Sequence, residues 1–171
     1  MKNLLLFLSL VVIISCDTPK EEVEAPKERA IGFNTFLPDL KWHLGTEDAI
    51  QIVKKIDVAW GKEDYSEMRK YLADTAKFYF ADGRFANSAD GFIEILKKDD
   101  AESPESSWTT DYAYSVDLNP EGGGEHVQAG FTVTELKDSV KVLTRYHESY
   151  YIIEGKLITW NSFDMDVKKK E

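Results

Sequence analysis

The fold is decided by residues 140–167, which read VKVLTRYHESYYIIEGKLITWNSFDMDV. β-Branched and aromatic side chains are frequent in both halves of this stretch, as is typical of β-strands. Glu154-Gly155 interrupts them with a turn signal, so the pattern predicts strands over Val140–Ile153 and Leu157–Val167. Because parallel neighbours need a long crossover, a connection this short predicts an antiparallel pair.

Two more long strands are predicted upstream, over Trp108–Asp117 and Glu125–Leu136. Asn119-Pro120 and the three glycines at 122–124 separate these strands, and Lys137-Asp138-Ser139 separates the second from residue 140 onward. The second half of the chain is therefore predicted to form an antiparallel meander of four strands.

Helical spacing dominates the first half of the chain. Thr46 is a good N-cap, Gly61 is a natural stop, and the apolar residues between them recur at helical spacing: Ala49, Ile52, Val53, Ile56 and Trp60. Asp64 begins a second helix, whose apolar stripe is Tyr65, Met68, Tyr71 and Leu72, and Ser88 caps a third with Phe92, Ile93 and Leu96. Helices gathered before a run of strands predict an α+β domain.

Three shorter segments complete this prediction. Residues Ala76–Phe80 form a strand that Asp82-Gly83 closes, and Asp99–Ser107 form a polar loop. Residues Ile31–Leu44 hold several apolar side chains around Pro38, and we expect them to pack as an N-terminal arm.

Taken together, these features resemble the NTF2-like superfamily, in particular its SnoaL-like members, from about Thr46 to Asp166. The motifs that carry the resemblance are Trp60-Gly61 followed by Asp64, Leu72-Ala73-Asp74-Thr75-Ala76, Gly91 with Ile93, and the hairpin Tyr150–Trp160. The resemblance implies a cone in which three N-terminal helices pack on a strongly curved, mainly antiparallel sheet, with a pocket in the open end. Many members dimerise through the outer face of the sheet. Members of the superfamily isomerise steroids, hydrolyse epoxides, dehydrate polyketides, or bind a ligand or protein without chemistry, so the fold does not fix the function.

The N-terminus has the layout of a secretory signal peptide. Lys2 is followed by an apolar run, Leu4–Ile14, that is too short for a permanent transmembrane helix. The run ends in Ser15-Cys16, and Ile-Ile-Ser-Cys resembles the lipobox of bacterial lipoproteins. We therefore expect residues 1–15 to be a lipoprotein signal peptide and Cys16, the only cysteine, to be acylated.

This interpretation predicts an exported outer-membrane lipoprotein that faces the periplasm or the cell surface. Its partner is the membrane, to which acylated Cys16 attaches it. Residues 16–30 are rich in Glu, Lys and Pro and nearly free of apolar side chains, so they are predicted to be a flexible tether. Residues 31–171 then form the NTF2-like domain.

The charge of the chain limits its partners. It carries 31 acidic and 21 basic residues, a formal net charge of −10. An acidic surface repels a phosphate backbone and lacks the polybasic character that anionic lipid attracts. Nucleic acid is excluded as a partner on this ground.

Catalytic residues are harder to find. In ketosteroid-isomerase-like members, the resemblance places the catalytic carboxylate at Phe80 and a tyrosine at Val53, and both positions are apolar here. The alternative enzyme hypothesis is a cofactor-independent isomerase or dehydratase that uses His147 with Asp82 or Asp164. Asp82 precedes Gly83, so it also fits a purely structural turn.

The sequence gives no metal or cofactor motif. The histidines at 43, 126 and 147 lie on separate elements without paired zinc spacing, and the glycines at 122–124 precede no helix that could cradle a phosphate. We therefore expect neither a metal nor a cofactor.

Aromatic residues are the remaining candidates for a site. A pocket for a small, partly apolar or aromatic ligand is predicted to be lined by Trp60, Tyr79, Tyr112, Tyr114, Tyr146, His147 and Trp160, with Tyr150 and Phe163 as further candidates. Each of these rings could instead fill the core. The leading hypothesis is a lipid-anchored binding module that holds a small ligand or a protein partner, with a homodimer through the sheet as a further expectation. The enzyme above and a purely structural envelope protein are its rivals.

Overall fold

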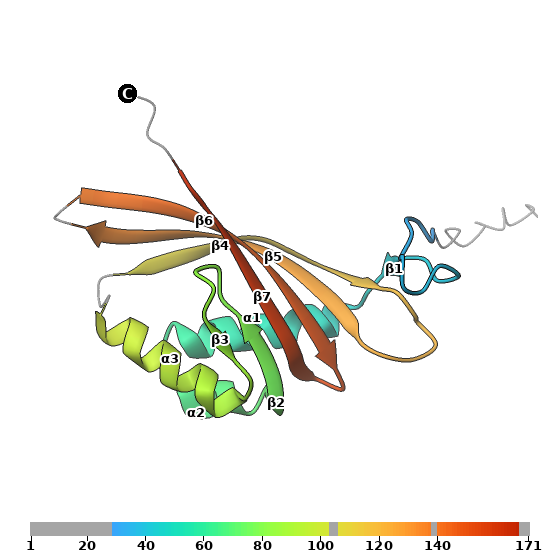
Figure 1. The fold of residues 1–171 in the computed structure, drawn as a ribbon, viewed down its shortest axis with the longest axis horizontal. Helices are drawn as coiled ribbons and strands as arrows, with labels where there is room; N and C mark the ends of the chain where they lie inside the picture. The colour runs from blue at the N-terminus through green and yellow to red at the C-terminus, as the bar shows by residue number, and fades with distance from the viewer. Residues whose placement is uncertain (1–28, 103–105, 138–139, 168–171) are drawn as a thin grey trace, which may run out of the picture.

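The computed structural model describes residues 29–102, 106–137 and 140–167 (Figure 1). The predicted signal peptide, the predicted acylation site Cys16 and nearly all of the predicted tether lie outside the described residues. Within the described part of the chain, no helix combines the length and the apolar character needed to cross a membrane.

Four long strands form the centre of a seven-stranded sheet. They are β4 (Ser107–Asp117), β5 (Glu125–Lys137), β6 (Val140–Ile153) and β7 (Lys156–Asp166). The strand order is β1-β4-β5-β6-β7-β2-β3, and every neighbouring pair is antiparallel except β2 and β7. The sheet twists along its length, and the three helices cover one face of it (Figure 1). The predicted α+β class and the antiparallel meander are confirmed.

Helix α1 (Glu47–Trp60) forms as the sequence predicts. The Thr46 hydroxyl accepts a hydrogen bond from the Ala49 amide at 3.3 Å, and it donates to Glu125 Oε1 at 2.7 Å. The helix start is thereby fixed both locally and to strand β5. Burial alone would raise the pKa of Glu125, but hydrogen bonds from Thr46 and Ser115 hold this pKa below its ordinary value.

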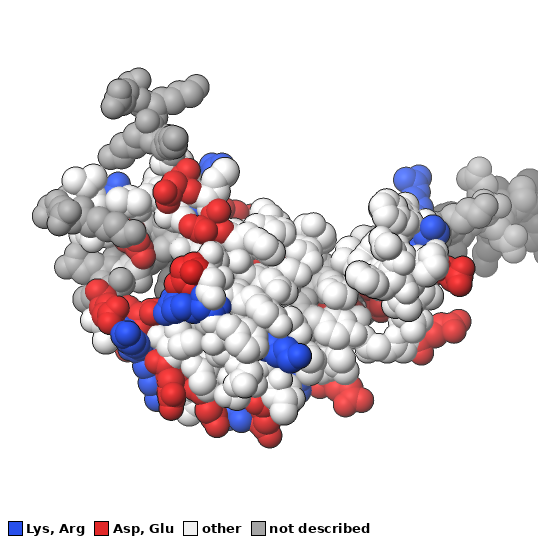
Figure 2. All heavy atoms as spheres, viewed as in Figure 1, with Lys and Arg blue, Asp and Glu red and all other residues white. Residues whose placement is uncertain are grey.

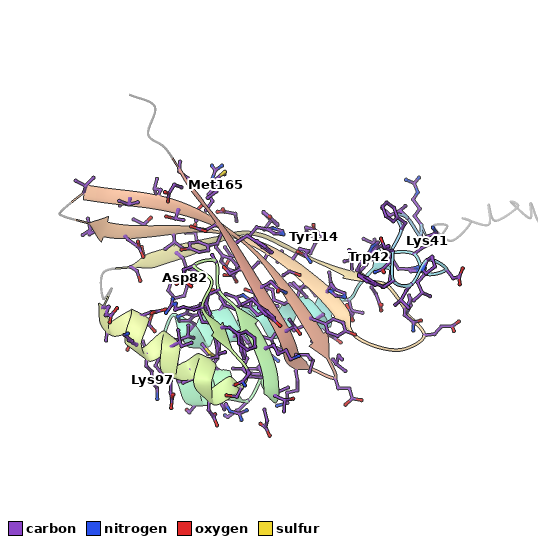
Figure 3. All side chains as sticks on the ribbon, in the orientation of Figure 1. Lys41, Trp42, Asp82, Lys97, Tyr114 and Met165 are labelled. Atoms are coloured by element: carbon purple, nitrogen blue, oxygen red, sulfur yellow. The ribbon has the colours of Figure 1, made fainter. Side chains whose placement is uncertain are left out.

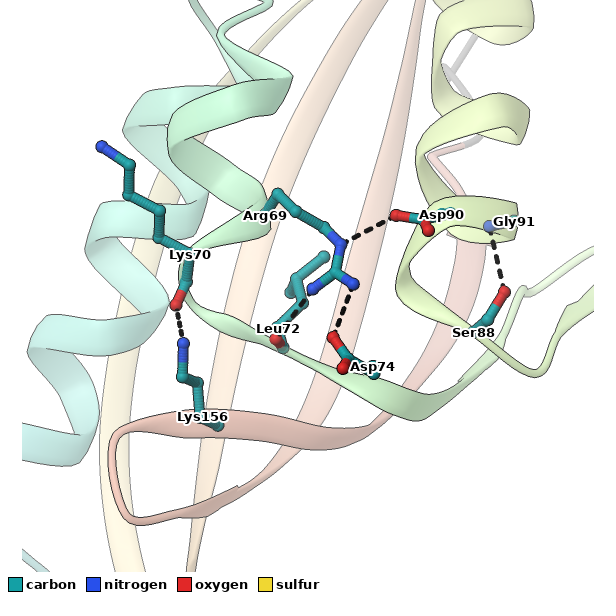
Figure 4. Close-up of polar contacts among 8 residues, drawn as sticks. All are labelled: Arg69, Lys70, Leu72, Asp74, Ser88, Asp90, Gly91 and Lys156. Carbon is teal, nitrogen blue, oxygen red and sulfur yellow. Dashed lines mark hydrogen bonds and ion pairs between the residues drawn. The ribbon is translucent and has the colours of Figure 1, made fainter.

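The connection after α1 differs from the prediction. Helix α2 (Tyr65–Arg69) is capped by Asp64 as expected but has only five residues, because Leu72 already begins strand β2 (Leu72–Tyr79). Arg69 holds this junction together with ion pairs to Asp74 at 2.6 Å and Asp90 at 2.8 Å (Figure 4). A short strand, β3 (Phe85–Ala86), pairs with β2 across a turn at which Gly83 has a φ of 87°.

Helix α3 (Ala89–Glu102) is longer than its apolar stripe indicates. Ser88 caps it by accepting a hydrogen bond from the Gly91 amide at 3.1 Å (Figure 4). The helix continues through Asp99 to Glu102, so the predicted loop at 99–107 is wrong over its first residues. The last turn of the helix extends beyond the buried core and has no apolar side chain to bury. The apolar pattern therefore could not predict this turn.

The N-terminal arm pairs with the sheet but leaves most of its apolar side chains exposed. Ile31 bridges to Trp42, and a short strand, β1 (His43–Leu44), adds to the edge of β4. Trp42 packs edge-on against His126, with ring centroids 5.3 Å apart. Phe33 and Phe36, in contrast, are 78% and 93% exposed. The expected packing of this arm is therefore limited to its main chain and Trp42.

The two faces of the sheet have different environments. On β6, the side chains of Tyr146, Glu148 and Tyr150 point toward the helices, and we call this the inner face. His147 points the other way, to the outer face. The core on the inner face is aromatic: the rings of Phe78 and Phe92 stack with centroids 3.9 Å apart.

Candidate functional site

A cavity of about 410 Å³ opens between the inner face of the sheet and the helices. Strands β4, β5, β6 and β7 form one wall, and helices α1 and α3 form the opposite wall. The hairpin between β2 and β3 contributes residues 80–82 and Arg84. Concave, largely preformed cavities of this size are the usual place for small-molecule sites.

Aromatic side chains line much of this cavity. Eight of the described lining residues are aromatic, and Trp60, Trp108 and Trp160 are among them. The Trp60 ring lies 5.9 Å from the Trp108 ring and 6.5 Å from the Trp160 ring, centroid to centroid. The three indoles come from α1, β4 and β7, so the fold itself brings them together.

Glu148 is the most unusual polar residue of the cavity. Its side chain points inward from the middle of β6, and the residue is only 8% exposed. Trp160 Nε1 donates a hydrogen bond to Glu148 Oε2 at 2.9 Å, and the Tyr150 hydroxyl donates to the same oxygen. Ser162 Oγ donates to Oε1 at 3.4 Å. These three neutral donors satisfy the carboxyl group without supplying a positive charge.

The environment of Glu148 changes its acidity. Burial raises the pKa of Glu148 to about 7, the negative charge of Asp57 adds to the rise, and the three hydrogen bonds oppose it. Burial and the Glu148 carboxyl also raise the pKa of Tyr150 well above its usual range, so Tyr150 stays a hydrogen-bond donor. Glu148 can thus hold or release a proton near neutral pH.

A second carboxyl group, Asp57, faces the cavity from helix α1. Trp108 Nε1 donates to Asp57 Oδ1 at 2.6 Å, and Thr110 Oγ1 lies 3.3 Å from Oδ2. Like Glu148, Asp57 is held by neutral donors from the sheet. The cavity therefore contains two carboxyl groups on facing elements.

The opening of the cavity is also acidic. The Arg84 guanidinium donates two hydrogen bonds to Asp99, at 2.7 and 2.9 Å, and one to Asp82 at 2.6 Å. Asp164 lies opposite Tyr146 in the register of β6 and β7. Burial, together with the charges of Asp164 and Glu135, raises the pKa of Tyr146. Figure 2 shows acidic side chains gathered over the ends of the long strands and α3, on the left of the view.

The structure brings some of the predicted site residues together and separates others. Trp60, Tyr146 and Trp160 line the cavity, as does Tyr150. Tyr79 points away from the cavity and packs on Phe85, because its neighbour Phe78 takes the buried position. The predicted residues on the outer face are Tyr112, Tyr114, His147 and Phe163.

A β-bulge explains why Tyr112 and Tyr114 lie on the outer face. The register between β4 and β5 shifts between Thr110 and Tyr112, so side chains beyond the shift change faces. Trp108 and Thr110 therefore point inward, whereas Tyr114 lies on the side of the sheet away from the helices, as Met165 does (Figure 3).

The predicted catalytic pairing of His147 with an aspartate does not assemble. Asp82 and Asp164 line the cavity, and Figure 3 shows Asp82 at the turn of the β2–β3 hairpin. His147 lies on the opposite face, where its Nδ1 is 2.9 Å from the Tyr112 hydroxyl. Alternation along β6 separates them, because His147 is one residue from the inward-facing Glu148.

Sequence reasoning missed both Glu148 and Asp57. A usable signal for Glu148 was its position midway between Tyr146 and Tyr150, which puts all three on one strand face. Asp57 follows the buried Ile56 at the edge of the apolar stripe of α1, and nothing in the sequence relates it to Trp108. Over the described ranges, no group of three or more His, Cys, Asp or Glu side chains is placed to hold a metal ion.

Comparisons with known proteins define the class of fold. No protein-family model matches the chain, and no curated protein matches it in sequence. Solved structures do match. A candidate ketosteroid isomerase from Kribbella flavida superposes with a TM-score of 0.58 at 10% identity, covering 75% of this chain and 85% of its own. An LEH-like epoxide hydrolase from M. tuberculosis gives 0.58 at 13% identity, with coverage of 70% and 84%. An NTF2-like protein from Burkholderia xenovorans gives 0.54 at 13% identity, with 71% and 92%.

These likenesses establish the NTF2-like fold and nothing finer, because the identities are low. The neighbours include an isomerase candidate, a hydrolase and a protein named only for its fold, so the fold is compatible with several activities.

Proposed function

We propose that this domain binds a small, partly apolar molecule in its inner cavity, and that a lipid on Cys16 anchors it in the bacterial envelope. The observation that carries the binding proposal is the cavity of about 410 Å³ with aromatic walls and the two carboxyl groups at Asp57 and Glu148. The anchoring proposal is supported by the lipobox-like sequence before Cys16.

Binding is tested by filling the cavity from one strand. Val133 lines the cavity, whereas its neighbour Thr134 points to the other face of β5. Val133→Phe should abolish the co-purification of a small molecule, read by mass spectrometry of the natively isolated protein. Thr134→Phe is the matched control and should leave the bound molecule in place. A wild-type protein that carries no ligand and binds none from a chemically diverse library would overturn the proposal.

Anchoring is tested by metabolic labelling. Radioactive palmitate should label the wild-type protein and not the Cys16→Ser variant. Equal labelling of the two would remove the lipoprotein interpretation.

A second candidate function is acid–base catalysis, and the raised pKa of Glu148 favours it. A carboxyl group that titrates near 7 on the wall of an aromatic-lined cavity can take a proton from a substrate and return it. This hypothesis replaces His147 by Glu148 as the acting group. Wild-type protein should then exchange the α-protons of a bound ketone with deuterium, and Glu148→Gln should not. His147→Gln should retain the exchange, which NMR detects.

The outer face supports the expectation of a homodimer. Four large side chains on this face are 47–60% exposed: Tyr112, Tyr114, Phe163 and Met165. A patch of this kind often marks a contact with another protein. Light scattering should give the mass of a dimer for the wild type and of a monomer for Phe163→Lys, and a monomeric wild type would contradict the expectation.

A further inference from the structure

Acidic side chains greatly outnumber basic ones in the lining of the cavity. Eight of the described lining residues are Asp or Glu, and one, Arg84, is basic. The guanidinium of Arg84 already pairs with both Asp99 and Asp82. The cavity therefore has a net negative charge and no unpaired cation of its own among the described lining residues.

The two inner carboxyl groups have partners that leave their charge uncompensated. Asp57 accepts from Trp108 and Thr110, and Glu148 accepts from Tyr150, Trp160 and Ser162. All of these donors are neutral. Glu148 is buried and Asp57 is half-buried, and taking a carboxylate out of water is costly unless an opposite charge compensates it. A ligand that supplies a positive charge would meet this need.

The walls of the cavity favour a particular kind of cation. Trp60, Trp108 and Trp160 come from three different elements, and Phe80 lies 5.1 Å from the Trp160 ring. Aromatic faces attract ammonium groups through the ring quadrupole and also pack against apolar groups. A small hydrated metal ion would use neither property, and the described residues form no metal-holding cluster.

We propose that the cavity selects an organic cation, namely an amine or quaternary ammonium compound with an apolar or aromatic body. This inference rests on the proposed ligand-binding function and specifies its ligand class. The cationic group binds near Asp57 and Glu148, and the apolar body packs on the indoles. An anion of the same shape is repelled by the lining, and a neutral molecule supplies no positive charge to either carboxyl group.

The test compares three probes of similar shape. Phenyltrimethylammonium is the cation, tert-butylbenzene is its neutral isostere, and phenylphosphonate is the anion. Binding to the purified protein is followed by tryptophan fluorescence, because three of the four tryptophans line the cavity, and by calorimetry. We expect the cation to bind at least about tenfold more tightly than the neutral isostere, and the anion not to bind.

Variants inside and outside the cavity test whether the preference for the cation arises from the cavity carboxyl groups. Asp57→Asn keeps an oxygen that can accept the hydrogen bond from Trp108. It should weaken the affinity for the cation about tenfold and change the affinity for tert-butylbenzene less than about twofold. Glu148→Gln should act in the same direction, so the test does not depend on the folding of one variant. Glu121→Gln removes an exposed carboxylate outside the cavity and should change neither affinity.

The outcomes separate this inference from the function on which it rests. If tert-butylbenzene binds as tightly as the cation, or if phenylphosphonate binds, the cavity is a ligand site without cation selectivity and the inference is overturned. If the cation binds equally well to wild type, Asp57→Asn and Glu148→Gln, the inference is overturned as well. If neither these probes nor a diverse library binds, the proposed function itself fails.

Discussion

Replacing Glu148 by glutamine should change how the stability of the domain depends on pH. In the folded protein the pKa of Glu148 is about 7, against an ordinary value of 4.5. Between these two values the folded state keeps the proton and the unfolded state releases it. The wild-type protein therefore loses stability from this group as the pH rises from 4.5, and the loss is complete above about 7.

The size of the effect follows from the shift. A shift of this size corresponds to about 3 kcal/mol in total, of which about 2–3 kcal/mol falls between pH 5 and pH 8. Glutamine is neutral in both states and contributes no such dependence. As the pH rises from 5 to 8, the free energy of unfolding of Glu148→Gln minus that of the wild type should therefore increase by about 2–3 kcal/mol.

Urea denaturation followed by tryptophan fluorescence at pH 5, 6, 7 and 8 measures this difference. Burial lowers the pKa of His126, which acts in the opposite direction, but His126 is present in both proteins and cancels in the comparison. Glu121→Gln is the control and should track the wild type at every pH. A difference between Glu148→Gln and wild type that stays constant with pH would refute the account of Glu148.

Two further predictions concern the scaffold. Thr46→Ala removes both the N-cap of α1 and the side-chain hydrogen bond to Glu125, and should lower the free energy of unfolding by about 1–2 kcal/mol. Thr46→Ser should retain most of the wild-type stability, and equal stability of Thr46→Ala and the wild type in urea denaturation would contradict this prediction. In Gly130→Ala, a Cβ would lie 2.2 Å from Tyr112 Cε1, so the Tyr112 ring must move and lose its contact with His147, at a cost of about 1 kcal/mol. The same substitution made in a Tyr112→Ala background should cost much less, and strictly additive effects in a double-mutant cycle would show that the two residues do not interact.

The elements that the sequence predicted well are those with local signals. Thr46 caps the start of α1 and Gly61 caps its end, and the turn at Glu154-Gly155 separates β6 from β7. Strands β1 and β3 have two residues each and form only because a neighbouring strand pairs with them. Two residues are too few to show the hydrophobic alternation that predicts a strand. The early start of β2 has a similar cause, since Leu72 pairs with Leu157, a residue distant in sequence.

The candidate site was harder to predict because it depends on strand faces and non-local partners. The bulge after Thr110 reverses the faces of Tyr112 and Tyr114, and alternation counted from Trp108 cannot reveal it. A glutamate in a strand is usually at the surface. The burial of Glu148 depends on Trp160 and Ser162 on the next strand. Only the assembled fold shows that its carboxyl group faces the cavity.

The most direct test of the central claim is an NMR titration of the Glu148 side-chain carboxyl carbon, with and without phenyltrimethylammonium. The account predicts a midpoint near 7 in the free protein, caused by burial, and a lower midpoint when the cation occupies the cavity. A carboxyl group that titrates near 4.5 and does not respond to the cation would contradict it.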